Sequence, residues 1–466
     1  MVLPIPIGRQ KEVLCLPAKG HFVILGTAGS GKTTLAILRS AYLSDPSTDH
    51  HGKTLLVTFN RALVAYLKHL QDRRLAHVVM ENYHQFARGY LSFRDKMLFN
   101  AICDPDLREM LIGQAVKQVS ERYKPDPLFN RAVALFSVEF RWMAQHGITT
   151  LKAYNEVERI GRAGARIDRK ERKVVFEIHT AYRDIREQWG KQYDWDDLAT
   201  AVCVEFDTDD SPRRYRHVVI DEGQDFSPEM IRSLAKAIPP DGSLTFFGDV
   251  AQQIYGHRMS WRSAGLNITK KWEFKENYRN TRQIARLGLA ISQMPFFKGL
   301  SDSDIVEPVS PTADGPLPTL VECPSIAKEI ELVIAQTNRG SKTLSIAILL
   351  RTREDETLIF PYLPSRSIRL HRDMTTWQVG PGLWYGTYHA AKGLEFDMVV
   401  LPFCSSERLP NPNDVAAFGE EDAIMQDGHL LYVGVTRAKT RLIMTYSGKV
   451  TRLLPREQGL YARVKL

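Results

Sequence analysis

A glycine-rich stretch, Gly26-Thr-Ala-Gly29-Ser-Gly31-Lys32-Thr33, follows an apolar run at 22–25 and precedes a run typical of a helix. Glycines let backbone N–H groups close around phosphate oxygens, and the N-terminus of a helix favours negative charge. Lys32 would contact the β- and γ-phosphates, and Thr33 would offer a hydroxyl ligand to Mg²⁺. A glycine turn beside a surface lysine is the alternative, which the flanking strand and helix disfavour. The pattern therefore predicts an ATP and Mg²⁺ site made by Gly26, Gly29, Ser30, Gly31, Lys32, Thr33 and Thr34.

Two carboxylates stand where another apolar run ends. The run at 217–220 (HVVI) leads directly into Asp221-Glu222-Gly223-Gln224-Asp225. Ligands of open α/β sheets bind at the carboxyl ends of the strands, so we expect these side chains to face the phosphate loop. Asp221 is placed to hold Mg²⁺ through water, and Glu222 is placed to accept a proton from an attacking water. Taken alone, this motif could equally be an ordinary acidic strand end.

The order of apolar runs and helical stretches favours parallel sheets. The runs at 22–25 and 54–59 are each followed by a helix-like stretch, and such alternation requires crossover connections. Residues 90–190 differ, because they show helical periodicity without clear strands. The sequence thus predicts an α/β protein with a helical insertion in its first lobe. Further buried strands are expected at 217–220, 244–247, 345–350, 398–402 and 441–445.

Composition narrows the class of protein. The 466 residues are too many for one ordinary core, and the net charge of +8 mildly favours a polyanionic partner. No apolar run reaches the ~20 residues that cross a bilayer, and the N-terminus lacks the apolar core of a signal peptide, so no membrane partner is expected. The cysteines show no C-x-x-C spacing, which excludes the usual zinc patterns and favours a reducing, cytoplasmic compartment. They are Cys15, Cys103, Cys203, Cys323 and Cys404.

A basic stretch at 152–173 has two interpretations. It is either a solvated helix face or a patch that contacts phosphates of a nucleic acid. Its basic residues are Lys152, Arg159, Arg162, Arg166, Arg169, Lys170, Arg172 and Lys173.

Nine segments, in order along the chain, resemble motifs of the UvrD/Rep-type superfamily I helicases. They are LLVTFNRAL (55–63), NYHQFA (82–87), YDWDDL (193–198), DEGQD (221–225), FGDVAQQIY (247–255), ENYRNTRQI (276–284), IAILLRTRED (346–355), GTYHAAKGLEFDMVVL (386–401) and LLYVGVTRAKTRL (430–442). The resemblance implies two RecA-like parallel-sheet lobes with ATP between them. Residues 1–89 plus 191–270 would form the first lobe, 90–190 the helical insertion, and 271–466 the second lobe.

The resemblance also implies roles for residues around the nucleotide. An arginine that stabilises phosphoryl transfer is worth on the order of 10³–10⁵ in rate. For the two arginines the alternative is a surface salt bridge, and for Gln10 it is an ordinary surface position. The implied roles are adenine recognition for Gln10, stacking on adenine for Tyr278, γ-phosphate contact for Arg279, γ-phosphate sensing for Gln252, ribose or phosphate contact for Glu395 and the arginine finger for Arg437.

Single strands are held by basic grooves with aromatic platforms. By motif position the candidates for nucleic-acid contact are Phe59, Asn60, His84, Tyr255, Trp261 and His389. Phe59 and Tyr255 have the alternative of being core aromatics, and the two histidines that of helix caps or core residues. Because IYGHRMSWRSAG is longer than the usual family segment, His257 competes with Trp261 for the stacking position.

The chain departs from the family pattern in several places. Larger relatives insert a domain, called 2B, where this chain has only the interval 356–385. Motif VI begins Asp427-Gly428-His429-Leu430 and lacks one usual arginine, Gly223 replaces a common aromatic residue, and Thr34 stands where relatives often have arginine. We expect ATP turnover to survive these departures, which should instead affect the efficiency of hydrolysis and its coupling to movement on nucleic acid.

Two functional hypotheses follow. The first is an ATP-dependent translocase or helicase on single-stranded DNA, with 3′-to-5′ polarity implied by the resemblance. The second is a nucleic-acid-stimulated ATPase subunit that regulates a partner protein such as a nuclease, as in bacterial anti-phage systems like Gabija, whose helicase-like subunit is similarly compact. The absence of a 2B domain favours the second hypothesis, and the residues do not distinguish DNA from RNA.

Overall fold

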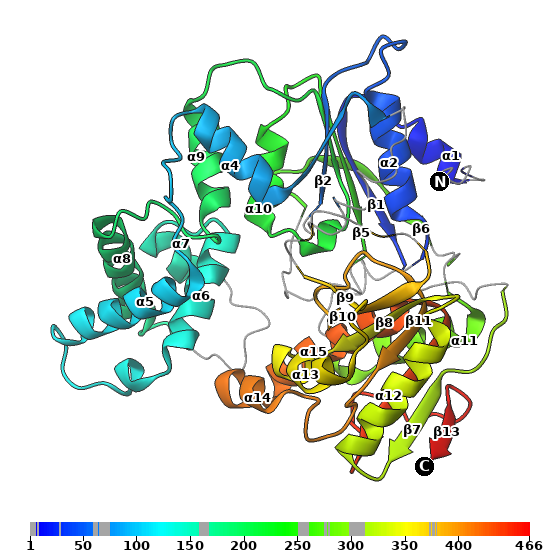
Figure 1. Ribbon diagram of the computed structural model, residues 1–466. Coiled ribbons are helices and arrows are strands. Elements are labelled where there is room, and N and C mark those ends of the chain that lie inside the picture. Colours follow the sequence, from blue (N-terminus) through cyan, green and yellow to red (C-terminus); the bar gives the residue numbers. More distant parts are fainter. Residues whose placement is uncertain are drawn as a thin grey trace.

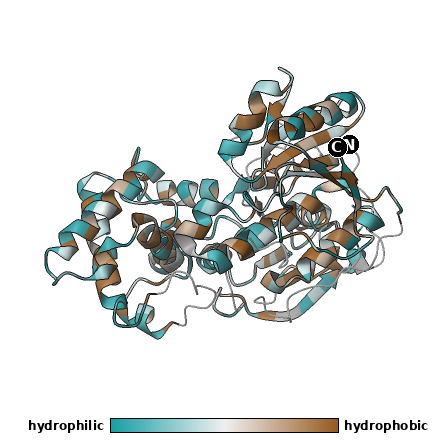
Figure 2. Cartoon of the chain, turned by 90° about the horizontal axis from the view of Figure 1, so that it is seen from below, coloured by the Kyte–Doolittle hydropathy of each residue, from teal (hydrophilic) through white to brown (hydrophobic). Residues whose placement is uncertain are grey.

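Two parallel β-sheets organise the chain, one above the other in Figure 1. The computed structural model describes residues 6, 9–27, 29–58, 64, 75–157, 167–249, 261–274, 277, 280–297, 313–371, 374, 378 and 380–466. Apolar strands occupy the middle of each sheet, and hydrophilic residues follow the outer faces of the helices (Figure 2). This is the pattern expected for sheets that helices cover on both faces.

The first sheet has six strands in the order β3-β2-β4-β5-β1-β6, all paired in parallel. β4 and β5 are buried along their whole length because they lie inside the sheet. β6 crosses the domain boundary expected at 270 and pairs with β1, so the first sheet extends to Phe274. The strands are β1 (Gly20–Gly26), β2 (Thr54–Thr58), β3 (Val78–Asn82), β4 (His217–Ile220), β5 (Ser243–Gly248) and β6 (Ile268–Phe274).

Helices that pack on the first sheet come from distant parts of the chain. The core beneath them joins apolar residues of the central strands to one face of α4, α9 and α10 on one side, and to α2 on the other. These helices are α1 (Arg9–Leu14), α2 (Lys32–Leu43), α4 (Tyr83–Phe93), α9 (Leu198–Thr208), η3 (Gly223–Asp225) and α10 (Pro228–Lys236).

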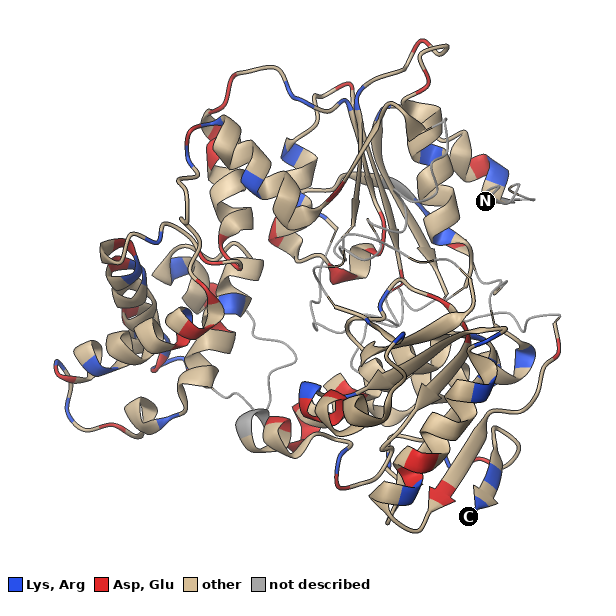
Figure 3. Cartoon of the chain, in the orientation of Figure 1, with Lys and Arg blue, Asp and Glu red and all other residues tan. Residues whose placement is uncertain are grey.

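The expected insertion is a separate helical unit with its own buried core. Figure 1 shows it beside the first lobe, and α6 packs against α9 and α10 and also touches α14 of the second lobe. Basic and acidic residues are interspersed over its helices (Figure 3). Its helices are α5 (Pro105–Ser120), η2 (Pro127–Asn130), α6 (Val133–Gln145), α7 (Leu151–Glu156) and α8 (Arg172–Gln188).

One member of the basic stretch is structural. Arg172 is buried, and its Nη1 donates to the carbonyl oxygens of Tyr154, Asn155 and Val157 at the end of α7. Arg172 therefore fits neither interpretation of the basic stretch, because its guanidinium is buried and bonded inside the insertion. Residues 158–166, which hold three further arginines of the stretch, lie outside the described residues.

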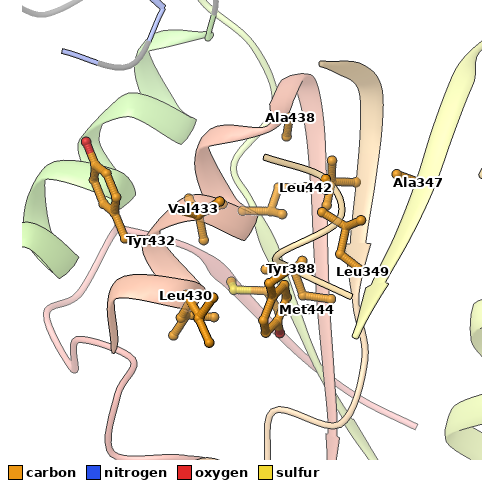
Figure 4. Packing of buried hydrophobic residues seen from close by; sticks show 14 of the residues in the cluster. Ala347, Leu349, Tyr388, Leu430, Tyr432, Val433, Ala438, Leu442 and Met444 are labelled. Carbon is orange, nitrogen blue, oxygen red and sulfur yellow. The ribbon is translucent and has the colours of Figure 1, made fainter. Parts of the chain in front are cut away.

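The second sheet has seven strands in the order β13-β7-β12-β11-β8-β10-β9, again paired in parallel. Figure 4 shows Leu430 and Val433 of α15 packed toward Leu442 and Met444 of β12. The strands are β7 (Thr319–Cys323), β8 (Ser345–Leu350), β9 (Ile368–Arg369), β10 (Gly382–Thr387), β11 (Phe396–Leu401), β12 (Ala438–Ser447) and β13 (Ala462–Lys465). The helices are α11 (Arg282–Ser292), η5 (Pro295–Phe297), α12 (Ile326–Gly340), α13 (Arg353–Ile359), η6 (Phe360–Tyr362), α14 (Pro412–Phe418) and α15 (Glu420–Thr436).

A buried acidic residue of α15 anchors the second lobe. Asp427 pairs with Arg351, which also pairs with Asp414 of α14, and the second carboxylate oxygen of Asp427 accepts from the backbone N–H of Asn411 at 2.7 Å. The pair ties the end of β8 to α14 and α15.

Among the helices that the structure describes, none combines the length and apolarity needed to cross a bilayer.

Candidate nucleotide site between the lobes

The glycine-rich loop connects β1 to α2. Gly29 and Gly31 have φ angles of 78° and 82°, a left-handed conformation that residues with a Cβ rarely adopt. Gly31 is the N-cap of α2, and it brings no side chain to the first backbone N–H groups of the helix. These groups therefore remain available to an anion, as a phosphate site requires.

Lys32 lies inside the loop. Its ammonium donates to the carbonyl oxygens of Gly26 at 2.8 Å and Thr27 at 2.7 Å, and its side chain is buried. These carbonyls keep the charge at the place where a triphosphate would bind. Thr33 and Thr34 are half-buried in the first turn of α2. The loop is therefore organised around a cation that can exchange carbonyl partners for phosphate oxygens.

Asp221 follows β4 and is 1% exposed. Within the described part of the chain, neither of its carboxylate oxygens has a hydrogen-bond partner. Burial raises the pKa of Asp221 to about 7 and the charge of Glu222 adds to this, while Thr33 and Lys32 act in the opposite direction. A buried carboxylate beside a threonine hydroxyl is a donor set that suits Mg²⁺, which prefers oxygen ligands. The residues present therefore fit the expected metal.

Glu222 has a different environment. Burial acts to raise its pKa, but the charges of Arg437 and Lys32 outweigh burial and the pKa is lowered. The backbone of Glu222 is left-handed, with φ 52° and ψ 42°, which turns this residue away from the direction of β4. The site thus keeps Glu222 ionised, as a proton acceptor must be, while it favours a proton or a cation on Asp221.

Arg437 reaches this site from the second lobe. It is fully buried at the end of α15, where its Nε donates to the carbonyl of Val433 at 3.3 Å and its Nη1 to that of Leu394 at 3.4 Å. Its charge is the largest influence that lowers the pKa of Glu222, ahead of the charge of Lys32. The structure therefore brings together the expected lysine, both carboxylates and one of the two expected arginines.

An ion pair crosses between the lobes. Lys392, in the turn between β10 and β11, pairs with Asp225 of η3, and both side chains are buried. Burial raises the pKa of Asp225 to about 6, and Lys392 opposes this rise. Motif II therefore interacts with two charges of the second lobe, Arg437 through its influence on Glu222 and Lys392 through the ion pair with Asp225.

Gln10 belongs to the first lobe and Glu395 to the second. The amide of Gln10 donates to the carbonyl of Ser30 at 3.4 Å, so it stands over the glycine loop. Arg39 of α2 holds this region, because its guanidinium donates to three carbonyls, one at the last residue of α1 and two just beyond it. Glu395 is half-buried beside Leu394, whose carbonyl accepts from Arg437. Gln252, Tyr278 and Arg279 lie outside the described residues.

Three candidates for nucleic-acid contact can be placed. His84 is in the first turn of α4, where its ring meets Trp195 edge-on at 5.3 Å, and Asn82, not His84, caps the helix. Trp261 is half-buried and packs edge-on against Phe246 at 4.9 Å. His389 is half-buried in the turn that contains Lys392. Phe59, Asn60 and Tyr255 lie outside the described residues.

Some residues of the site were missed by sequence reasoning. Gln224, Asp225 and Lys392 stand inside segments that resemble motifs II and V, and that position was the only available signal. Phe246 explains the glycine of motif II, because a Cβ on Gly223 would lie 2.2 Å from an atom of its ring. The Phe246 ring thus takes the space next to motif II that a side chain at position 223 would need.

Family comparisons agree with this arrangement. Residues 8–273, more than half of the chain, match the UvrD/REP helicase N-terminal domain, and residues 386–449 match the UvrD-like helicase C-terminal domain. A probable DNA helicase of Mycoplasma pneumoniae is 22% identical over 94% of this chain and 83% of its own length.

Other relatives are much longer than the segment that they share with this chain. The putative ATP-dependent DNA helicase YjcD of Bacillus subtilis is 25% identical over 57% of this chain and 35% of its own length. DNA helicase II of Haemophilus influenzae is 23% identical over 59% of this chain and 38% of its own length. The match thus covers little more than a third of these two proteins. Because the match to the N-terminal domain covers more than half of the chain, the chain belongs to the UvrD/REP helicase family of superfamily I.

Proposed function

We propose that this chain is an ATP-driven motor that moves along single-stranded DNA in the 3′-to-5′ direction and hydrolyses ATP between its two lobes. The observation that supports this most strongly is the convergence of charges from both lobes in one buried site. Lys32 and Glu222 come from the first lobe, and Arg437 comes from the second. Relatives named as DNA helicases support DNA as the track.

Each residue has a chemical task in this proposal. The ammonium of Lys32 leaves the loop carbonyls and binds the β- and γ-phosphates. Glu222, ionised at neutral pH, accepts a proton from the water that attacks the γ-phosphorus. Arg437 stabilises negative charge that develops on the transferred group. Bound through Thr33 and Asp221, Mg²⁺ would neutralise phosphate charge.

A site shared between lobes turns hydrolysis into motion. A triphosphate held from both sides favours closure of the lobes, and loss of its terminal phosphate removes that preference. The track would use His84 and Trp261 on the first lobe and His389 on the second. Alternate grip by the two lobes would then produce steps along the strand. Gln10 and Glu395 would contact the base and the sugar or phosphates.

ATP turnover with and without single-stranded DNA tests the proposal. We expect DNA to stimulate the wild type, and Glu222→Gln to lower kcat by about 10²–10⁴-fold, the usual worth of a positioned general base. Glu331→Gln is the matched control, because Glu331 is exposed on α12 and pairs only with surface Lys328 among the described residues. Turnover by Glu222→Gln at the wild-type rate would overturn the catalytic assignment. Tailed duplexes with 3′ or 5′ single strands then test direction.

A regulatory ATPase is the second candidate. Between β8 and β10 the described residues form only α13, η6 and β9, so no further domain stands where long relatives insert one. A partner protein, for example a nuclease, could then receive the conformational change. Strand displacement by the purified protein discriminates the two candidates. DNA-stimulated turnover without displacement, restored by a partner, favours regulation.

A further inference from the structure

Gln224 connects two segments of the first lobe. It lies in η3, two residues after Glu222, and its side chain is buried. Its amide nitrogen donates to Oε2 of Glu222 at 2.5 Å, and its amide oxygen accepts from the backbone N–H of Asp249 at 2.9 Å. A backbone N–H only donates and a carboxylate only accepts, so only this orientation of the amide satisfies both partners.

The neighbours of Gln224 leave it little freedom. Asp249 directly follows β5, the strand beside β4, so the amide bridges the carboxyl ends of two adjacent strands. A Cβ on Gly248 would lie 3.3 Å from the amide oxygen of Gln224 and 2.6 Å from the Phe246 ring. The absence of a side chain at Gly248 therefore leaves room for both the Phe246 ring and the amide oxygen of Gln224. Hydrogen bonds to ionised groups are about twice as strong as neutral ones.

We propose that Gln224 is a positioning residue for Glu222. It fixes Oε2 and thereby leaves the other carboxylate oxygen for the attacking water. Through Asp249 it also fixes this orientation to the start of the segment that resembles motif III. The inference rests on the proposed ATPase function and concerns how that activity is tuned. In this role Gln224 orients the general base, and it does not itself bind the nucleotide.

Two substitutions test the two hydrogen bonds of Gln224, one to Glu222 and one from Asp249. Gln224→Met keeps the length of the side chain and removes both hydrogen bonds. Gln224→Glu retains an acceptor for the Asp249 N–H but directs a second carboxylate at Glu222. We expect both to lower kcat at saturating DNA by about 10–100-fold, the effect of losing one hydrogen bond to a charged group. The dissociation constant of a non-hydrolysable ATP analogue should stay within about twofold.

The controls make failure of this inference distinct from failure of the proposed function. Gln336→Met, an exposed position on α12, should match the wild type in kcat. A wild type that does not hydrolyse ATP with any strand would remove the proposed function itself. If the wild type is active and Glu222→Gln is not, a Gln224→Met kcat within about twofold of wild type overturns the positioning role. An analogue affinity that weakens in step with kcat overturns it too, because Gln224 would then support the pocket as a whole.

Discussion

Gly223→Ala should destabilise the first lobe, although it adds only one methyl group. The new Cβ would lie 2.2, 2.4 and 2.7 Å from three atoms of the Phe246 ring, where ordinary contact begins at 3.4 Å. The ring cannot retreat freely, because it is buried and Trp261 packs edge-on against it. Overpacking of a filled core costs ~1–3 kcal/mol, so we expect a loss of that size in the free energy of unfolding.

Urea titration of single and double variants measures this effect. Phe246→Leu reduces the ring and should relieve the clash, so Gly223→Ala should cost less in that background, with a coupling of about 0.5–3 kcal/mol. Gly89→Ala is the matched control, since nothing lies within 4 Å of its added Cβ, and in helix α4 it should stabilise by ~0.5–1 kcal/mol. If the effects of Gly223→Ala and Phe246→Leu simply add, the steric explanation of Gly223 is wrong.

Three further outcomes are expected. Arg437→Ala should lower kcat by about 10³-fold or more with little change in affinity for an ATP analogue, and unchanged turnover would remove its role as arginine finger. Arg351→Met leaves Asp427 buried without its charge partner and should cost ~3–5 kcal/mol; adding Asp427→Leu should restore part of this, because the backbone N–H of Asn411 then loses its acceptor, and urea titration of both variants checks the prediction. Burial lowers the pKa of His217 to about 4, so the stability it contributes above about pH 6.5 should be lost as pH falls toward 4, and His217→Gln should reduce that loss in unfolding measured at pH 7.5 and 5.

Strands inside the sheets were predictable because they are buried on both faces. The runs at 217–220 and 345–350 coincide with β4 and β8, while the run at 398–402 lies within one or two residues of β11. Strands at or near the sheet edges were missed. β6 (ITKKWEF) and β13 (ARVK) contain charged residues, because one side of an outer strand faces solvent and interrupts the apolar run.

The candidate site also has a part that the sequence predicts and a part that it does not. The glycine loop and the Asp221–Glu222 pair are contiguous, so the residue types and their order suffice to predict them. The bond between Gln224 and Asp249 and the ion pair between Asp225 and Lys392 join residues that are distant in sequence. No local pattern encodes such contacts, because they depend on which strands become neighbours and on how the lobes meet. Gly223 was visible as a departure, but its partner Phe246 was not.

The strand order of the first sheet also affects how the protein is made. β1 ends in the glycine loop, yet its two neighbours in space, β5 and β6, are among the last parts of that lobe to be translated. At about 5–20 residues per second, roughly ten to fifty seconds pass between synthesis of β1 and arrival of these partners. During that time the apolar FVIL segment of a nascent chain has both edges unpaired, a condition that invites aggregation. We expect ribosome-bound intermediates to protect this segment, through a chaperone or the ribosomal exit tunnel, until the lobe can close around it.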